Sequence, residues 1–186
     1  MRVFISGGCK NGKSTYAQHL AQKQGQGRPL YYIATMAAVD NEDEERILRH
    51  QNERDGWGFV TVEQPRNIEE ILEKCDTHGS FLLDSLTALL SNEMFQAGKI
   101  DMTAHERIAQ GLKQILQKID NIVIVSDYIY SDAFLYDELT EGYRKALATL
   151  DRLAAQQCDI VLEAAYTSIV QISDGKTPPI CSDNKE

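Results

Sequence analysis

The sequence GGCKNGKS at residues 7–14 lies between the apolar run Val3–Ile5 and a helix-like run from Tyr16 to Ala21. It fits the pattern G-x-x-x-x-G-K-[ST] in full, which is typical of loops that bind nucleotide phosphates. Its glycines let the backbone take positive φ, so that several N–H groups turn toward phosphate oxygens. The helix that follows adds the positive end of its dipole. We therefore predict a phosphate loop, with Lys13 on the β/γ-phosphates and the Ser14 hydroxyl on Mg²⁺.

A glycine-rich turn that binds nothing is the alternative for residues 7–14. The position of the motif, directly after a strand and before an amphipathic helix, favours the phosphate loop. Cys9 lies inside it, either as a small filler or as a redox-sensitive thiol.

Length, charge and cysteine content limit the possible classes of protein. The 186 residues suit one domain, which we place at residues 1–172, followed by a polar, frayed tail at 173–186. A net charge of −9 argues against binding to nucleic acid. No apolar run reaches the roughly 20 residues of a membrane helix, so we expect a cytoplasmic protein. The four scattered cysteines support neither a disulfide framework nor a zinc site.

Strand-like and helix-like runs alternate along the chain. Short apolar runs at 30–34, 59–62, 81–84, 122–125, 160–162 and 168–170 read as strands. Helical spacing or composition marks 67–75, 86–95, 108–119 and 139–153. Continuous apolar strands separated by helices predict an α/β fold, a mostly parallel central sheet with helices on both faces.

Asp84 ends the strand-like run that begins at Phe81. In a parallel sheet, ligands bind beyond the carboxyl ends of the strands, and a carboxylate there can hold Mg²⁺ directly or through water. Alternatively, Asp84 caps the helix that starts near Leu86. The phosphate loop at residues 7–14 favours the metal site.

The segment from Asp40 to Arg54 reads as a helix of almost wholly charged residues. Its residues Arg46, His50 and Arg54 are four apart, so they line one face. This cationic stripe could bind a nucleotide phosphate. The alternative is a solvated face with ordinary ion pairs, which the spacing alone favours.

Several motifs together resemble the bifunctional adenosylcobinamide kinase/adenosylcobinamide-phosphate guanylyltransferase family of cobalamin biosynthesis. They are the loop at 7–14, Tyr32-Ile33-Ala34-Thr35, Asp40-x-Glu42-x-x-x-Arg46-Ile47-x-x-His50, Trp57, Glu63-Gln64-Pro65, Leu83-Asp84-x-Leu86-Thr87 and Ser91-Asn92. The resemblance implies a RecA-like P-loop NTPase fold, a homotrimer, Mg²⁺, ATP or GTP as substrate, and a corrinoid acceptor. It also implies two reactions, in which the acceptor is phosphorylated and GMP passes to it from GTP through a guanylylated His50.

The resemblance also implies which residues form the site. His50 and Lys13 are the catalytic residues, and Ser14 and Asp84 hold the metal. The nucleotide-binding residues are Gly7, Gly8, Cys9, Lys10, Asn11, Gly12, Lys13, Ser14, Thr15, Ile33, Ala34, Thr35, Arg46, Gln51, Asn52, Glu53, Arg54 and Glu63.

The second half of the chain departs from the family pattern. Ser126–Tyr130 replaces the family's Asn-Glu-Val-Gly, and the Gly-Ile-Val-Pro that follows is missing. Where the family has Phe-Arg-Asp…Gly…Asn, this chain has Tyr143-Arg144-Lys145…Ala148…Asp151, so only the arginine persists. Two other hypotheses therefore stay open: a P-loop small-molecule kinase with one activity, and a non-catalytic nucleotide-binding or regulatory protein.

Overall fold

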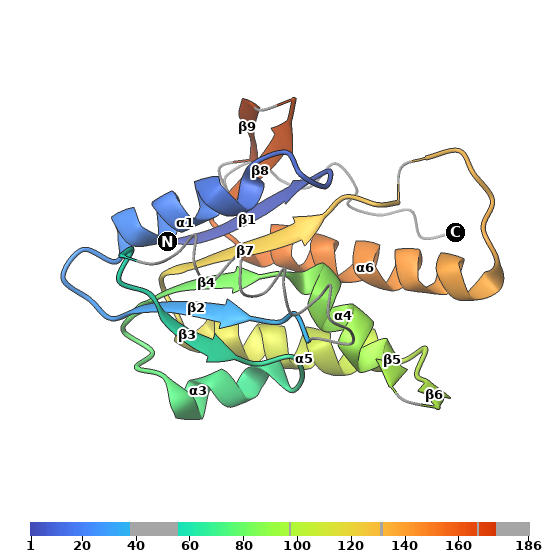
Figure 1. Ribbon diagram of the computed structural model, residues 1–186, viewed down its shortest axis with the longest axis horizontal. Helices are drawn as coiled ribbons and strands as arrows, with labels where there is room; N and C mark the ends of the chain where they lie inside the picture. The colour runs from blue at the N-terminus through green and yellow to red at the C-terminus, as the bar shows by residue number, and fades with distance from the viewer. Residues whose placement is uncertain (38–55, 97, 131, 167, 174–186) are drawn as a thin grey trace.

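The computed structural model describes residues 1–37, 56–96, 98–130, 132–166 and 168–173. Its centre is a seven-stranded sheet with the order β3-β2-β4-β7-β1-β8-β9 (Figure 1). The strands are β1 (Arg2–Gly7), β2 (Leu30–Ala34), β3 (Val60–Glu63), β4 (Ser80–Asp84), β7 (Ile122–Asp127), β8 (Ile160–Ala165) and β9 (Ser168–Ser173). All neighbours pair in parallel except β8 and β9, which pair antiparallel.

The helices lie on both faces of the sheet (Figure 1). They are α1 (Lys13–Gln24), α3 (Ile71–Lys74), α4 (Leu86–Met94), α5 (Ala104–Lys118) and α6 (Glu138–Gln157), with a 3-10 turn η1 at Ile68–Glu70 before α3. A two-stranded ribbon of β5 (Phe95–Gln96) and β6 (Lys99–Ile100) follows α4.

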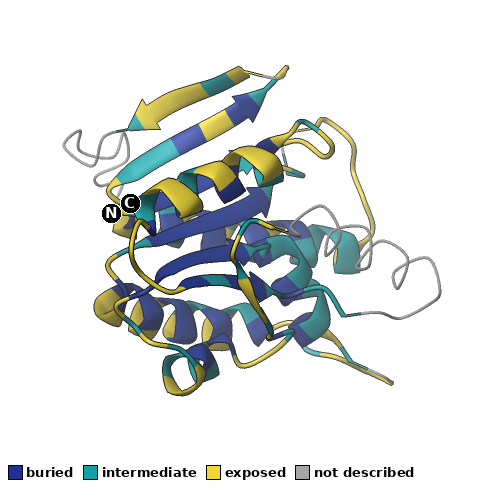
Figure 2. Cartoon of the chain, turned by 60° about the vertical axis from the view of Figure 1, so that its left-hand side comes forward, coloured by how far each residue is buried: buried dark blue, intermediate teal, exposed yellow. Residues whose placement is uncertain are grey.

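Two apolar clusters form the core, one on each face of the sheet. Successive strand residues point to opposite faces. In β1, Val3 and Ile5 therefore join α1 in one cluster, while Phe4 joins α4, α5 and α6 in the other. The central strands are almost fully buried, whereas β9 at the sheet edge is mostly exposed (Figure 2). Burial on both faces explains why the strands read as continuous apolar runs.

Local sequence explains where two of the helices begin. The Ser85 hydroxyl accepts a hydrogen bond from Ala88 N at 3.2 Å, and Asp137 accepts one from Thr140 N at 2.9 Å. Both are N-cap bonds, which satisfy backbone donors that the first helical turn leaves open. Because Ser85 caps α4, the alternative that Asp84 is the cap is wrong.

Most of the expected elements are confirmed, with differences at their ends. The run at 59–62 forms β3 one residue later, and the stretch at 67–75 divides into η1 and α3. The last two apolar runs form an antiparallel hairpin, whose final residue is Ser173. The charged segment from Asp40 to Arg54 and the tail beyond Ser173 lie outside the described residues.

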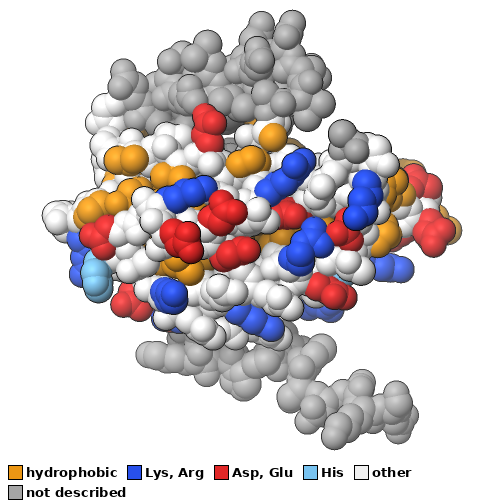
Figure 3. Space-filling model, turned by 90° about the horizontal axis from the view of Figure 1, so that it is seen from below, with side chains coloured by type: hydrophobic (Ala, Val, Ile, Leu, Met, Phe, Trp, Pro, Cys, Tyr) orange, Lys and Arg blue, Asp and Glu red, His pale blue; other side chains and the backbone are white. Residues whose placement is uncertain are grey.

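The surface charge is mixed where it is seen from below. Figure 3 shows lysine and arginine side chains interspersed with aspartate and glutamate on this face. Among the described residues, no helix is both long enough and apolar enough to span a membrane.

Candidate nucleotide site at the carboxyl ends of the strands

The carboxyl ends of four neighbouring strands form the candidate site. The loop at residues 7–14 leaves β1, and in the ladder Gly7 is the register partner of Asp127, the last residue of β7. Asp84 ends β4 on the other side of β7, and Ala34 ends β2 beside Asp84. Ligands of open α/β sheets bind beyond the carboxyl ends of the strands. The loop and Asp84 are therefore separated by one strand, and Asp127 lies at the end of that strand.

The loop takes the conformation that its glycines predict. Gly12 has φ +82°, in the left-handed region, and α1 begins at the next residue. A side chain at Gly7 would lie 2.4 Å from the carbonyl oxygen of Ala164 on β8. Asn11 fastens the loop to the same carbonyl, because its Nδ2 donates to Ala164 O at 2.6 Å. The exposed residues Gly8 to Lys10 leave the loop open to a ligand.

Lys13 is the first residue of α1, directly after Gly12, and its side chain is almost fully buried. Its Nζ donates to the carbonyl oxygen of Gly8 at 3.0 Å and to Asp127 Oδ1 at 2.5 Å. Cys9 Sγ is also 3.8 Å from that carboxylate oxygen. The residue that is expected to bind phosphate is therefore held between the loop backbone and an acidic side chain from β7.

Thr35 and Asp84 have well-defined partners at the ends of β2 and β4. The Thr35 hydroxyl donates to Ser85 O at 2.8 Å and accepts from Ser85 N at 2.7 Å, so this fully buried side chain ties β2 to the start of α4. Asp84 Oδ2 accepts from the Tyr32 hydroxyl at 2.9 Å. Ile33 is buried in the core cluster that faces α4 and α5.

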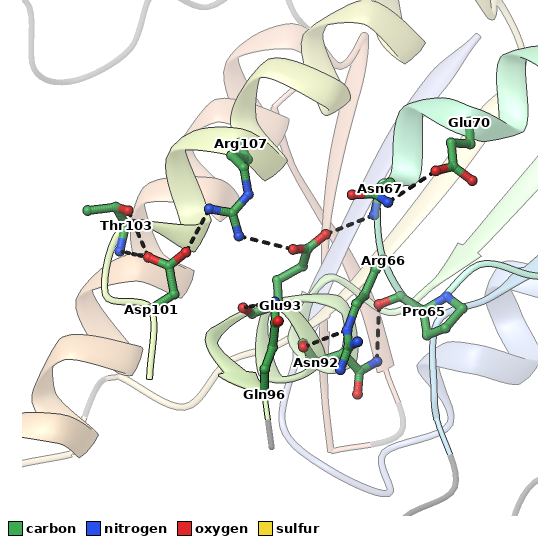
Figure 4. A network of polar contacts seen from close by, with 10 residues as sticks. All are labelled: Pro65, Arg66, Asn67, Glu70, Asn92, Glu93, Gln96, Asp101, Thr103 and Arg107. Carbon is green, nitrogen blue, oxygen red and sulfur yellow. Dashed lines mark hydrogen bonds and ion pairs between the residues drawn. The ribbon is translucent and has the colours of Figure 1, made fainter. Parts of the chain in front are cut away.

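A polar network fixes the segment after β3 against α4 (Figure 4). Asn92 Nδ2 donates to Thr35 O at 2.6 Å and to Pro65 O at 3.3 Å, which bridges the ends of β2 and β3. The buried Glu93 accepts from Asn67 N at 2.8 Å and pairs with Arg107 of α5. This network gives Pro65 and Asn92, one residue from each of two motifs of the sequence analysis, a structural role.

Arg107 extends the network to the ribbon side of α4. Its NH1 donates to Asp101 at 2.7 Å, and this hydrogen bond, together with those from Thr103, holds the pKa of Asp101 well below its usual range (Figure 4). The Arg107 side chain is half exposed and that of Asp101 is 19% exposed, so water screens part of the ion pair, which ties the start of α5 to α4 through Glu93.

A second polar cluster lies close to Asp127 and is formed by residues of α4, of α6 and of the chain directly after β7. Asp151 of α6 is 3% exposed, and its Oδ2 accepts from the Tyr130 hydroxyl at 3.0 Å. Burial raises the pKa of Asp151 to about 6, and the negative charge of Asp127 contributes to this rise. Burial also raises the pKa of Tyr143, again with a contribution from Asp127. The hydroxyl of Tyr143 donates to Thr87 O at 2.9 Å.

The segment that follows β7 is held in place by Arg144. This buried side chain donates to Ile129 O at 3.2 Å, Glu141 at 2.6 Å and Asp132 at 2.9 Å. It also lies 4.7 Å from the ring centre of Tyr136. These contacts give Arg144 a structural role in holding the segment after β7 against α6.

The structure brings together only part of the predicted site. The carboxyl ends of the strands bring together residues 7–15, Ala34, Thr35 and Asp84. Glu63 is exposed at the end of β3. Arg46, His50, Gln51, Asn52, Glu53 and Arg54 lie outside the described residues. The nucleotide contacts of all these residues stay predictions. Sequence reasoning missed Asp127 as a partner of Lys13, although the rule that ligands bind at strand ends applies to it as it does to Asp84.

Comparisons with known proteins identify the family. The family model for cobinamide kinase / cobinamide phosphate guanyltransferase matches residues 3–170. The bifunctional adenosylcobalamin biosynthesis protein CobP of Pseudomonas aeruginosa is 29% identical over 163 residues, which cover 87% of this chain and 91% of that protein. The protein CobU of Escherichia coli, which has the same description, is 30% identical over 100 residues, or 53% of this chain and 52% of that protein. This chain therefore matches about half the length of the E. coli relative.

A solved structure shows the fold. The KaiC-like protein PH0186 of Pyrococcus horikoshii superposes with a TM-score of 0.54, at 13% identity, over 94% of this chain and 79% of that one. The expected RecA-like P-loop architecture is confirmed, with a mostly parallel sheet and helices on both faces. With the family match over residues 3–170, this architecture leads to one conclusion: the chain belongs to the cobinamide kinase / cobinamide phosphate guanyltransferase family.

Proposed function

We propose that this protein phosphorylates adenosylcobinamide and then transfers GMP from GTP to adenosylcobinamide-phosphate through a guanylyl-histidine. The observation that carries the proposal is the contact of Lys13 Nζ with Gly8 O inside a complete phosphate loop, in a chain that matches the family over residues 3–170. Both reactions need the same thing first, which is a triphosphate held against positive charge.

In the kinase reaction, the hydroxyl of the acceptor attacks the γ-phosphorus. The loop N–H groups, the start of α1 and Lys13 stabilise the negative charge on the equatorial oxygens of the transferred group. Ser14 and Asp84 would hold Mg²⁺, because Mg²⁺ prefers oxygen ligands and is usually held by one or two protein groups together with phosphates. When bound, the ion neutralises charge on the phosphates.

In the transferase reaction, neutral His50 attacks the α-phosphorus of GTP and pyrophosphate leaves. The acceptor phosphate then attacks the guanylyl group and frees the imidazole, so that one displacement is split into two. Arg46 and Arg54 would bind phosphates and disfavour the protonated imidazole by repulsion. These three residues lie outside the described part of the chain, and their roles rest on the resemblance of the Asp40–His50 motif.

Mass spectrometry of the protein after incubation with GTP and Mg²⁺ tests this proposal. We expect the parent to gain the mass of one guanylyl group through an acid-labile, base-stable bond, as a phosphoramidate is. His50→Ala should lose this label and all transfer, since a methyl group cannot attack phosphorus. It should keep phosphorylation of adenosylcobinamide. His78→Ala, which changes an exposed histidine that follows α3, is the matched control.

Label on His50→Ala, or none on a parent that is an active kinase, would contradict the covalent role of His50. The second outcome would favour a P-loop small-molecule kinase with one activity. One observation supports that alternative: Ser126–Tyr130, at the end of β7 and just after it, stands in place of the family motif, and Asp127 pairs with Lys13. A parent with no turnover of either kind would instead favour a non-catalytic nucleotide-binding protein.

The family resemblance also leads us to propose a cytoplasmic homotrimer. Light scattering on the purified protein measures its mass in solution. A monomer or dimer would contradict the trimer.

A further inference from the structure

Asp127 is held more rigidly than a surface carboxylate. Its backbone is the ladder partner of Gly7, and Tyr128 N donates to Gly7 O at 2.9 Å. Its own N–H donates to Thr87 Oγ1 at 2.8 Å, which fixes it to α4 as well. The backbone pairing therefore fixes the position of Asp127 relative to Gly7, the first residue of the phosphate loop.

The side chain of Asp127 is bound on one oxygen only. Lys13 Nζ and Cys9 Sγ both approach Oδ1, whereas no described residue donates a hydrogen bond to Oδ2. Among the described residues, Lys13 in turn finds acceptors for two of its three N–H donors, Gly8 O and Asp127. The third donor remains for a phosphate, so Lys13 can bind the triphosphate while it stays paired with Asp127. A γ-phosphate on Lys13 would then lie close to Oδ2.

The other carboxylates at this edge are less suited to accept a proton from a substrate. Asp84 Oδ2 accepts from Tyr32, and β7 lies between the strand that ends in Asp84 and the strand that leads into the loop. Asp151 is 3% exposed and accepts from Tyr130, so a substrate hydroxyl cannot reach it. Among the described residues, Asp127 is the carboxylate that directly contacts Lys13.

We propose that Asp127 is the general base of the phosphorylation step, an inference that rests on the kinase half of the proposed function. The hydroxyl oxygen of the acceptor forms a bond to the γ-phosphorus, and its proton passes to Asp127 Oδ2. The bond between the γ-phosphorus and the bridging oxygen breaks, and its electron pair stays on the β-phosphate of the nucleoside diphosphate. The contact with Lys13 fixes the position of the carboxylate beside the site where the γ-phosphate would bind.

Asp127→Asn tests this inference, because asparagine keeps the shape of the side chain and removes its basicity. We expect kcat for phosphorylation of adenosylcobinamide to fall by about 10²–10⁴-fold, the range for loss of a general base. The Kd for the nucleotide, measured by calorimetry, should stay or tighten, since Lys13 loses a competing anion. Transfer of GMP to pre-phosphorylated acceptor should fall by far less, because a phosphate acceptor is already ionised.

Asp120→Asn is the matched control, because Asp120 precedes the same strand at its opposite end and its side chain is 83% exposed. A kcat for Asp127→Asn within about threefold of the parent would show that Asp127 is only a counter-ion for Lys13. A raised Mg²⁺ requirement with kcat restored at saturating Mg²⁺ would make it a metal-site residue. Either result overturns the inference alone, whereas a parent that never phosphorylates adenosylcobinamide overturns the proposed kinase as well.

Discussion

The phosphate loop at residues 7–14 follows β1, and the region formed by the end of β7 with residues 128–130 and 132–137 follows the neighbouring strand. The two regions are built in opposite ways. The loop depends on backbone geometry, with positive φ at Gly12 and a close approach of Gly7 to Ala164 O. The region at the end of β7 depends on side chains, among them Asp127, Tyr130 and the contacts of Arg144. Phosphates are the same in every nucleotide, so a backbone cradle for them tolerates little change. Side-chain chemistry on the neighbouring strand can change with the acceptor.

Lys13→Ala should produce the largest effect, because the two regions meet at this residue. We expect both activities to fall by at least about a thousandfold and nucleotide binding to weaken, since one charge serves the triphosphate in both reactions. Steady-state assays of both reactions and calorimetric titration with nucleotide measure this. Lys23→Ala, at the far end of α1, is the control. Turnover within tenfold of the parent would remove the phosphate-loop interpretation.

Asp84→Asn should have a smaller effect, which is confined to the metal. Asparagine can still accept the hydrogen bond from the Tyr32 hydroxyl, so the fold should persist. We expect the Mg²⁺ concentration for half-maximal activity to rise by about ten- to a hundredfold, because a neutral amide oxygen is a weaker ligand. A Mg²⁺ titration of kinase activity measures it, with Asp76→Asn, before the start of β4, as the control. An unchanged requirement would leave Asp84 without a metal role.

How much the sequence predicts differs between these regions for physical reasons. The central strands could be predicted because burial on both faces makes runs such as Ile122–Val125 continuously apolar. The loop could be predicted because its glycines encode its backbone. The contact of Asp127 with Lys13 could not, because it depends on strand order: nothing local shows that β7 lies between β1 and β4. The direction of β9 likewise depends on a three-dimensional pairing.

The predicted site residues show the same division. Asp84 and the loop were found because a motif and a strand end mark them. The family resemblance assigned Thr35 to the nucleotide, whereas the structure shows its hydroxyl bonded to both backbone groups of Ser85. Its role beside a nucleotide stays a prediction. A motif shows that a residue matters, but a buried hydroxyl that joins two strand ends and one that binds a ligand leave the same trace in a sequence.

Asp151→Asn should have the smallest effect on activity and a measurable effect on stability. Asp151 has a pKa of about 6 in the folded protein against about 3.8 unfolded, because burial disfavours its charged form. Between these values the folded state binds more protons than the unfolded state, so stability falls as pH rises from about 4 to about 6. Above pH 6 the folded protein carries the full cost of a buried charge.

Asparagine has no charge to bury and still accepts the hydrogen bond from Tyr130. Asp151→Asn should therefore be more stable than the parent by about 1–3 kcal/mol at pH 7.5, and no more stable at pH 4. Urea denaturation at the two pH values measures the difference, and Asp159→Asn, on the exposed turn after α6, is the control. A gain of equal size at both pH values would mean that charge burial is not its cause. Since the charge of Asp127 contributes to the raised pKa, Asp127→Asn should reduce the gain, which would show that the site and the interior of α6 are electrostatically coupled.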